Sequence, residues 1–370
     1  MRHVLVGFAT ATLVAMIAVA PGSAQPTGAS PAASMRGDGP PPAARPFSIT
    51  RADPGLDAIV PRGAKLELLA QGFGLNEGPV WIPDAHGGYL LVSDLLDNVI
   101  YKIAADKTVS VFMEKAGYSG DDVNHTGAQT RSGRSHVLLI GPSCTGLDSQ
   151  GRLIWCADND RAMMRLEKDG SRTVLSTGLD GKRFSGPNDL TTRADDGIYI
   201  TDNDFGLRDA GKSSDKQMPN GVWLIRDGQT RLVLDDKSLG GIPNGIVLSP
   251  DGQHLYLTAS SGKLWRYDVK PDGSLGDRIL FTEGPGIGDG MKVDKQGDVY
   301  STSGGGPGIV RITSPAGKLL GFINLPIYGG EPKKQICATN VTFGGPARSD
   351  LFIAACDAVY RIRLRSVGAR

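Results

Sequence analysis

Short apolar runs alternate with turns rich in glycine and aspartate from about residue 65 to residue 365. Within this region one unit recurs six times: a short polar opening, an apolar strand, a Gly/Asp turn, and a second strand that ends in small or acidic residues. A third strand often follows, as at 221–224 and 263–267. The second strands of the six units are expected at residues 89–94, 153–158, 197–202, 254–258, 298–302 and 350–355.

The spacing of the six units predicts an all-β fold, a six-bladed β-propeller. Successive openings lie 43 to 68 residues apart, close to the length of a four-stranded propeller blade. The longest gap contains an insertion at 113–142. The last unit has room for a third strand but no fourth, and residues 65–71 precede the first opening. We therefore expect this N-terminal strand to close the last blade. A β-sandwich with irregular hairpins is the alternative.

The start of the chain differs from the repeats. Residues 1–24 have the pattern of a secretory signal peptide, with a basic start, an uncharged stretch at 4–20 and small residues before the expected cleavage site. A membrane anchor is the alternative, but the apolar stretch is short for a bilayer span. Residues 25–46 are rich in Pro, Ala, Ser and Gly and predict a flexible linker. The propeller domain is then expected at 47–370, in the periplasm or secreted, with no membrane attachment after signal removal.

The charge balance excludes several classes of partner. The 370 residues include 40 Lys and Arg against 39 Asp and Glu, for a net charge of +1. Nucleic acid and anionic membranes need a broad positive surface, so neither is an expected partner. The 51 glycines and 23 prolines disfavour a helical protein. The composition is compatible with a monomer.

Four cysteines fall into two pairs, and each pair brackets one predicted hairpin: Cys144 with Cys156, and Cys337 with Cys356. The second pair is aligned by a register that sets Phe343 opposite Asp350. Disulfides would suit an exported protein. Four buried thiols are the alternative, because cysteine also packs as a small apolar residue.

The openings of the six units carry the candidate chemistry, because the first residues of the innermost strands converge at one end of a propeller channel. Five of the six equivalent positions hold a carboxylate or an amide: the set is Glu77, Thr145, Asn188, Asn244, Asp289 and Asn340. Oxygen donors without His or Cys favour a hard cation, above all calcium, with magnesium, manganese or zinc as alternatives. Alternatively, these residues only cap strands and turns.

Five segments together resemble a known family. They are EGPVW at 77–81, GKRFSGPNDL at 181–190, TDNDFG at 201–206, PNGI at 243–246 and DGMKVD at 289–294. In this order they are similar to the signature segments of the senescence-marker-protein/gluconolactonase family. The resemblance spans about 65–365 and implies a six-bladed propeller that binds one divalent cation in its channel and hydrolyses a lactone.

The resemblance also implies roles for single residues. It makes Glu77, Asn188, Asn244 and Asp289 the metal ligands, the residues that the repeat comparison also selects. Asp289, a carboxylate at the cation, is the candidate general base. Asn188 is expected to contact the substrate as well.

Two residues near this predicted site have open assignments. Arg183 is expected either to reach substrate oxygens or to bind a neighbouring blade. Asp202 is a candidate for substrate hydroxyls, with an ordinary strand-end role as the alternative.

The second unit departs from the family pattern. It has Thr145-Gly146 where many relatives have Asn-Gly, and Asp158 where relatives often have His.

The expected function is metal-dependent hydrolysis of a sugar lactone such as gluconolactone. The alternatives are hydrolysis of organophosphates or lipophilic lactones by the same architecture, and a non-catalytic, calcium-stabilised binding module.

Overall fold

The computed structural model describes residues 44–123, 128–130, 136–207, 215–259, 261–304, 308–327 and 337–369. The predicted signal peptide and nearly all of the predicted linker lie outside the described residues. No helix in the described part of the chain has the length and apolarity needed to cross a bilayer.

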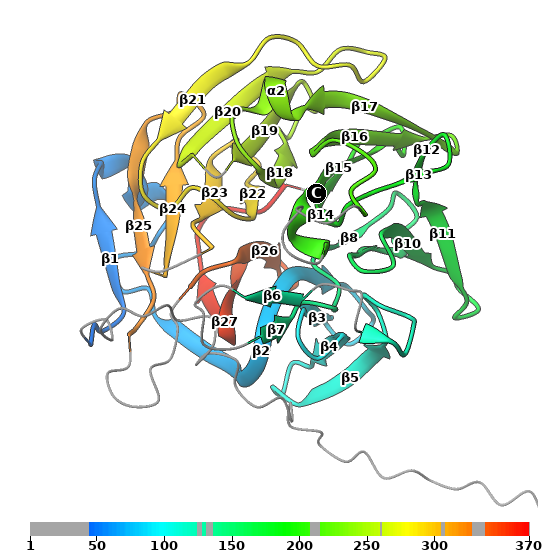
Figure 1. Ribbon diagram of the computed structural model, residues 1–370. Helices are drawn as coiled ribbons and strands as arrows, with labels where there is room; N and C mark the ends of the chain where they lie inside the picture. The colour runs from blue at the N-terminus through cyan, green and yellow to red at the C-terminus, as the bar shows by residue number, and fades with distance from the viewer. Residues whose placement is uncertain are drawn as a thin grey trace, which may run out of the picture.

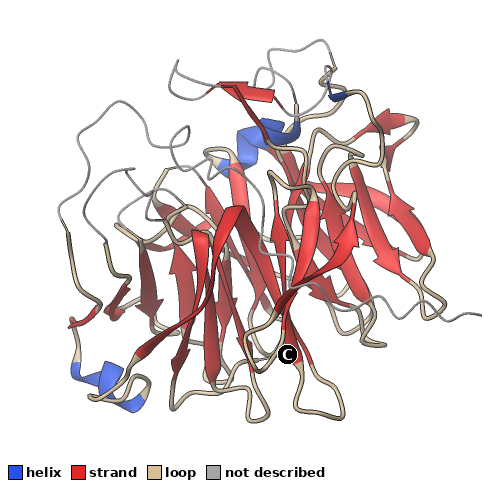
Figure 2. Cartoon of the chain, turned by 90° about the horizontal axis from the view of Figure 1, so that it is seen from below, coloured by secondary structure: helices blue, strands red, loops and turns tan. Residues whose placement is uncertain are grey.

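In the described residues, the strands form six blades around a common centre (Figure 1), and their strands run between the two faces of the ring (Figure 2). Blade one contains the second half of β2 (Leu66–Ile82), then β3 (Tyr89–Asp94), β4 (Val99–Ile103) and β5 (Val109–Glu114). Blade two contains β8 (Thr145–Leu147), β9 (Leu153–Ala157), β10 (Ala162–Leu166) and β11 (Arg172–Ser176). Blade three contains β14 (Pro187–Thr192), β15 (Ile198–Asp202), β16 (Gly221–Arg226) and β17 (Gln229–Asp235).

The other three blades repeat this order from the centre outward. Blade four contains β18 (Pro243–Leu248), β19 (His254–Ala259), β20 (Lys263–Asp268) and β21 (Ile279–Glu283). Blade five contains β22 (Met291–Val293), β23 (Val299–Thr302), β24 (Ile309–Thr313), β25 (Leu319–Asn324) and β1 (Ser48–Arg51). Blade six contains β26 (Asn340–Gly344), both halves of β27 (Asp350–Arg363) and the first half of β2.

Small elements complete the described structure. The insertion at 113–142 contains the hairpin of β6 (Ala128–Thr130) and β7 (His136–Leu138), and β12 (Gly178–Leu179) pairs with β13 (Lys182–Arg183). The short helices are η1 (Pro54–Ala58), η3 (Asp204–Gly206) and α2 (Asp236–Leu239).

The ring closes through two long strands that each serve twice. The first half of β27 pairs with β26, and its second half pairs with the first half of β2, where Leu66 lies opposite Ile362. The second half of β2 then pairs with β3 and begins blade one. The prediction that the N-terminal strand closes the last blade is therefore confirmed.

Two details of the fold differ from the sequence-based expectations. β1 extends blade five as a fifth strand, which the repeat pattern did not indicate. In the last hairpin, Asp350 lies opposite Gly344 and not opposite Phe343, so the predicted register was wrong by one residue. The two cysteines of that blade still meet, because Cys356 lies beyond the regular pairing of β26 with β27.

Both predicted disulfides are present. Cys144 and Cys156 are joined with their Cα atoms 5.0 Å apart, and Cys337 and Cys356 with their Cα atoms 5.6 Å apart. The described residues contain no free cysteine.

Apolar side chains fill the spaces between neighbouring blades. In the core between blades one and two, Trp155 packs with Leu91 and Ile100, and all three are fully buried. Comparable clusters fill the other five junctions, so each sheet buries both faces against its neighbours. This packing fixes the inner strands, and hence their first residues, around the centre.

A belt of hydroxyl groups joins the blades near the centre. At every junction, a Ser or Thr hydroxyl oxygen lies 2.7 to 3.2 Å from a backbone carbonyl oxygen of the next blade. The pairs are Ser93 with Ser143, Ser143 with Pro187, Thr201 with Asn244, Thr258 with Asp289, Thr302 with Thr339, and Thr339 with Asn76. These bonds hold the backbone of the candidate ligands Asn244 and Asp289.

Candidate metal centre and active site

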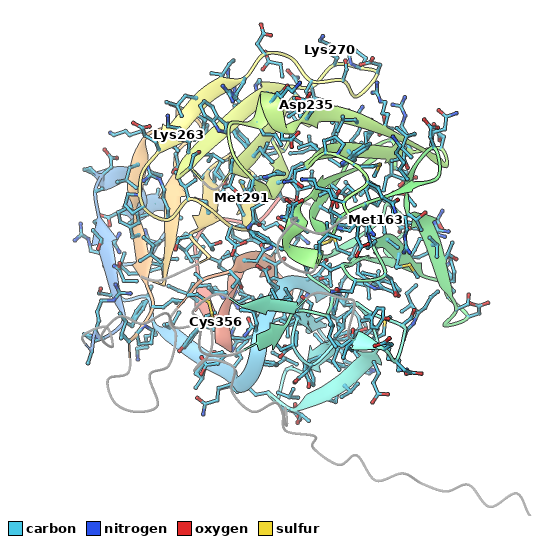
Figure 3. The ribbon with its side chains drawn as sticks, viewed as in Figure 1. Met163, Asp235, Lys263, Lys270, Met291 and Cys356 are labelled. Atoms are coloured by element: carbon cyan, nitrogen blue, oxygen red, sulfur yellow. A yellow bond between two sulfur atoms is a disulfide. The ribbon has the colours of Figure 1, made fainter. Side chains whose placement is uncertain are left out.

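The four predicted ligands all lie where an inner strand begins, and three of them meet directly. The carboxyl group of Asp289 lies beside the side chains of Glu77 and Asn244, which brings blades one, four and five together. Met291, two residues after Asp289, lies near the centre of the ring (Figure 3). The pattern of oxygen donors at equivalent repeat positions thus does produce a cluster.

A β-bulge accompanies three of the ligands. The strand register shifts between Glu77 and Val80, between Pro187 and Asp189, and between Pro243 and Ile246. A bulge breaks the alternation of side chains and redirects one of them, and bulges are common beside active sites. Here Glu77, Asn188 and Asn244 keep some exposure, whereas the residues beside them are mostly buried.

Two further polar side chains extend the cluster to blades three and six. The Asn340 amide donates to Glu77 Oε2 at 3.3 Å, and it also lies beside the Asp189 carboxyl group, whose pKa it lowers. Asp189 accepts from the backbone N–H groups of Leu190 at 2.8 Å and Ile246 at 3.2 Å. Asp189 was missed at the sequence level, although it directly follows Asn188.

Among the four predicted ligands, only Asn188 has a buried side-chain oxygen, its Oδ1 atom, without a hydrogen-bond partner. Buried polar atoms normally find partners, so an orphaned amide oxygen at this position fits a ligand to a cation. Asn188 adjoins the cluster through its chain neighbour Asp189, which lies beside Asn340.

The carboxyl groups of the cluster repel one another in a buried environment. Burial raises the pKa of Asp289 to about 7, and the charge of Asp189 adds to this. Burial and the charge of Asp289 raise the pKa of Glu77 well above its ordinary value. Burial also raises the pKa of Asp189, against the positive charge of Lys292. Such a site favours either shared protons or a bound cation.

The donor set fits a hard divalent cation. Glu77 and Asp289 supply carboxylates, and Asn188 and Asn244 supply amide oxygens. No group of three or more His, Cys, Asp or Glu in the described residues is arranged to hold a metal by itself, so the amides are essential to this assignment.

Glycine allows the inner strands to approach this closely. A Cβ atom on Gly245 would lie 2.2 Å from the backbone oxygen of Asp289, and one on Gly290 would lie 2.0 Å from Cγ of Asn340. Any side chain there would separate the blades that carry the ligands.

Blade two contributes its polar groups to structure. The Thr145 hydroxyl donates to the backbone oxygen of Gly78. Buried Asp158 accepts the Ser143 hydroxyl at 2.5 Å, and burial raises the pKa of Asp158 well above its ordinary value. Of the two departures from the family pattern, Thr145 thus contacts blade one and Asp158 contacts Ser143 of its own blade.

Arg183 lies on the segment that leads to Asn188, and Asp202, at the end of β15, contacts this segment. Arg183 is exposed and its guanidinium donates to the backbone oxygen of Asp160, which joins it to blade two. Asp202 is fully buried, and its two oxygens accept from the backbone N–H groups of Ser185 and Gly186. Burial raises the pKa of Asp202 to about 7. The predicted contacts of both residues with substrate stay predictions.

Comparison with known proteins decides the family. Residues 75–357 match the model of the SMP-30/Gluconolactonase/LRE-like region. The chain belongs to this family. The matched residues include all four predicted ligands and both disulfides.

Two gluconolactonases and a regucalcin are similar to this chain. A gluconolactonase from Zymomonas mobilis is 34% identical over 336 residues, covering 86% of this chain and 87% of the relative. The solved structure of a gluconolactonase from Xanthomonas campestris is 28% identical, with a TM-score of 0.69 over 88% of this chain and 99% of that chain. A calcium-binding regucalcin from Agrobacterium tumefaciens has the same fold, with a TM-score of 0.60 at 17% identity over 83% of this chain and 98% of that chain.

Proposed function

We propose that this protein hydrolyses a sugar lactone to the open hydroxy acid, as a gluconolactonase does. The observation that carries the proposal is the convergence of Glu77, Asn244 and Asp289, with the orphaned oxygen of Asn188 on the adjoining network. The long match to a gluconolactonase over most of both chains supports the same reaction. The polar side chains at the centre favour a sugar lactone over a lipophilic lactone or an organophosphate.

The cation is part of the proposal. Glu77, Asn188, Asn244 and Asp289 would hold one divalent ion, with calcium as the first choice and magnesium, manganese or zinc as alternatives. When bound, such an ion would supply charge stabilisation for a developing oxyanion.

The side chains of the site would transfer the proton of the attacking water and orient the lactone. Asp289 Oδ takes a proton from the attacking water while the water oxygen bonds to the lactone carbonyl carbon. The ring C–O bond then breaks, and the proton held by Asp289 passes to the ring oxygen, which becomes the hydroxyl group of the product. In this proposal Asn188 and Arg183 orient substrate oxygens before this step.

The export of the protein is proposed with the function. Two disulfides support an oxidising compartment, the periplasm or the exterior, and a signal peptide at 1–24 would deliver the chain there. The partner would be a small lactone, and the active unit a monomer.

Hydrolysis of glucono-δ-lactone, followed by acid release at constant pH, tests the reaction. With calcium present we expect turnover by the parent and a loss of about 10²- to 10⁴-fold in Asp289→Asn, because the general base is removed. Chelation of divalent cations should abolish turnover, and added calcium should restore it.

The control is Asp235→Asn, which removes a carboxylate from the end of β17, well outside the cluster. It should keep parental turnover. Full activity in Asp289→Asn would remove Asp289 from the mechanism. Calcium-dependent stabilisation without turnover on any lactone would instead favour a binding module.

A further inference from the structure

Two blades hold their candidate ligands in the same unusual way. In blade one, Asp94 at the end of β3 accepts from the backbone N–H groups of Gly74 at 2.7 Å and Leu75 at 3.1 Å. In blade three, Asp202 at the end of β15 accepts from Ser185 at 2.9 Å and Gly186 at 2.7 Å. Both carboxyl groups are fully buried.

The contacted N–H groups occupy equivalent places before the ligands. Gly74 and Leu75 lie three and two residues before Glu77, and Ser185 and Gly186 lie three and two residues before Asn188. In each blade the carboxylate thus accepts hydrogen bonds from the backbone segment immediately before the ligand. The repeat of one contact at two separated sites indicates a shared purpose.

We propose that Asp94 and Asp202 are positioning residues that set the ligands Glu77 and Asn188 for the cation. This inference rests on the cation site of the proposed function. A carboxylate can accept from two neighbouring N–H groups at once, which fixes the direction in which the chain enters the inner strand. Groups that orient metal ligands in this way typically change metal affinity 10- to 100-fold when they are altered.

The replacement Asp202→Asn changes the hydrogen bonds of this side chain but not its size, so it distinguishes a positioning role from a packing role. Asparagine has the same shape, but it offers one acceptor oxygen, and its NH₂ group would face the second backbone N–H. The segment before Asn188 would lose one hydrogen bond and gain a donor–donor contact. Asp235→Asn is the matched control, because Asp235 ends β17 of the same blade and accepts from Ser238 N at 3.0 Å, nearer the rim of the ring (Figure 3).

Two measurements on the whole protein test the proposal. Calorimetric titration with calcium should show 10- to 100-fold weaker binding for Asp202→Asn, and parental binding for Asp235→Asn. Hydrogen exchange without metal should rise in the peptide 182–190 of Asp202→Asn and not at 72–79. Asp94→Asn should give the opposite pattern, and it serves as the second variant if Asp202→Asn does not fold.

The outcomes distinguish this inference from the proposed function. If the parent binds none of calcium, magnesium, manganese and zinc, the cation of the proposed function fails, and exchange alone then decides whether the carboxylates position these segments. Calcium affinity in Asp202→Asn within twofold of the parent would overturn the inference. So would faster exchange spread over all blades, because it would indicate a general loss of stability.

Discussion

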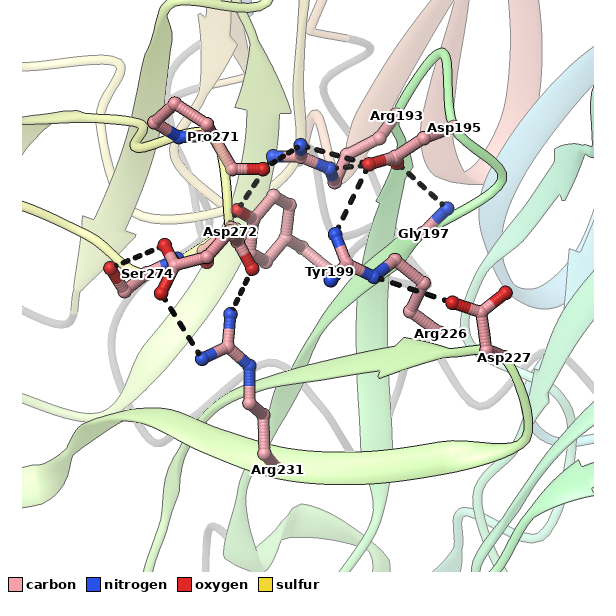
Figure 4. A network of polar contacts seen from close by, with 11 residues as sticks. Arg193, Asp195, Gly197, Tyr199, Arg226, Asp227, Arg231, Pro271, Asp272 and Ser274 are labelled. Atoms are coloured by element: carbon pink, nitrogen blue, oxygen red, sulfur yellow. Dashed lines mark hydrogen bonds and ion pairs between the residues drawn. The ribbon is translucent and has the colours of Figure 1, made fainter.

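At the scale of single residues, two carboxyl groups outside the site have pKa values shifted in opposite directions. Asp298 is buried beside Asp294, and burial together with this neighbouring charge raises the pKa of Asp298 to about 7. Asp195, on the turn between β14 and β15, contacts Arg193 at 2.8 Å (Figure 4), and this guanidinium lowers the pKa of Asp195 to about 2. The two residues therefore make opposite contributions to the free energy of unfolding.

The replacement Asp298→Asn should stabilise the protein only at high pH. Between about pH 4 and pH 7 the folded protein keeps a proton on Asp298 that the unfolded chain has released, so the free energy of unfolding falls as pH rises through this window. Asparagine does not ionise and still offers a donor to Asp294. In urea unfolding with chelator, the variant should gain about 1 to 3 kcal/mol over the parent at pH 8 relative to pH 5.

Asp195→Asn is the control of opposite sign. The Asp195 carboxylate stabilises the fold above its unfolded pKa, and this contribution is lost only as pH falls towards about 2. The variant should therefore be destabilised by a similar amount at pH 5 and pH 8. If Asp298→Asn changed stability equally at both pH values, the assignment of a raised pKa to Asp298 would be wrong.

The sequence predicted the candidate ligands better than the residues that contact them. Glu77, Asn244 and Asp289 could be found because each fills the same place in a repeated unit. Asp189 was missed because strand alternation assigns neighbouring residues to opposite faces, and only the bulge at Pro187–Asp189 changes that order. The contacts of Asp202 with Ser185 and Gly186 depend on loop geometry, which no periodicity records.

At the scale of elements, the disulfide of blade six stands where other blades use a carboxylate. Cys337 lies three residues before Asn340, the place that Ser185 has before Asn188. Its partner Cys356 accepts the Asn76 amide through its backbone oxygen at 2.6 Å, directly beside Glu77. The disulfide thus fixes the start of β26 and the strand that carries a candidate ligand.

Removing this disulfide should weaken both the fold and the site. Cys337→Ala with Cys356→Ala opens a link between residues 19 apart, and we expect the free energy of unfolding to fall by about 3 kcal/mol. The double variant Cys144→Ala with Cys156→Ala, 12 residues apart, should lose a similar amount. Only the first should also bind calcium more weakly, because Asn76 and Glu77 depend on Cys356.

Thiol titration in denaturant provides the check on the starting protein. The parent, produced under oxidising conditions, should release no reactive thiol before reduction and four thiols after it. Free thiols in the unreduced protein would contradict the disulfide assignment. Equal calcium affinity in both double variants would contradict the link between Cys356 and the site.

The strands themselves were largely predictable. Five of the six expected second strands agree with the structure to within one residue at each end, because alternating apolar residues and Gly/Asp turns are local signals. The sixth, expected at 350–355, continues as β27 to Arg363. The pairing of β1 with β25 had no local signal, since it joins segments more than 260 residues apart.

At the scale of the whole molecule, the ring is held shut by chain segments from opposite ends. The first half of β2 pairs with the second half of β27, whereas β1 only adds a fifth strand to blade five. A propeller that loses its closing strand exposes the edge of the last blade and the apolar faces on both sides of it. The two N-terminal strands should therefore differ sharply in importance.

Truncation from the N-terminus tests this difference. A chain that begins at Ala44 is the parent, one that begins at Asp53 lacks β1, and one that begins at Gly72 lacks β1 and the closing half of β2. We expect the second to melt cooperatively at a temperature several degrees lower, because blade five keeps four strands. The third should show no cooperative melting transition, since Phe352 and Val359 of blade six would lose the β2 residues packed against them. Circular dichroism during heating measures both effects, and a cooperative transition at the parental temperature in the third chain would show that the ring does not need this strand to close.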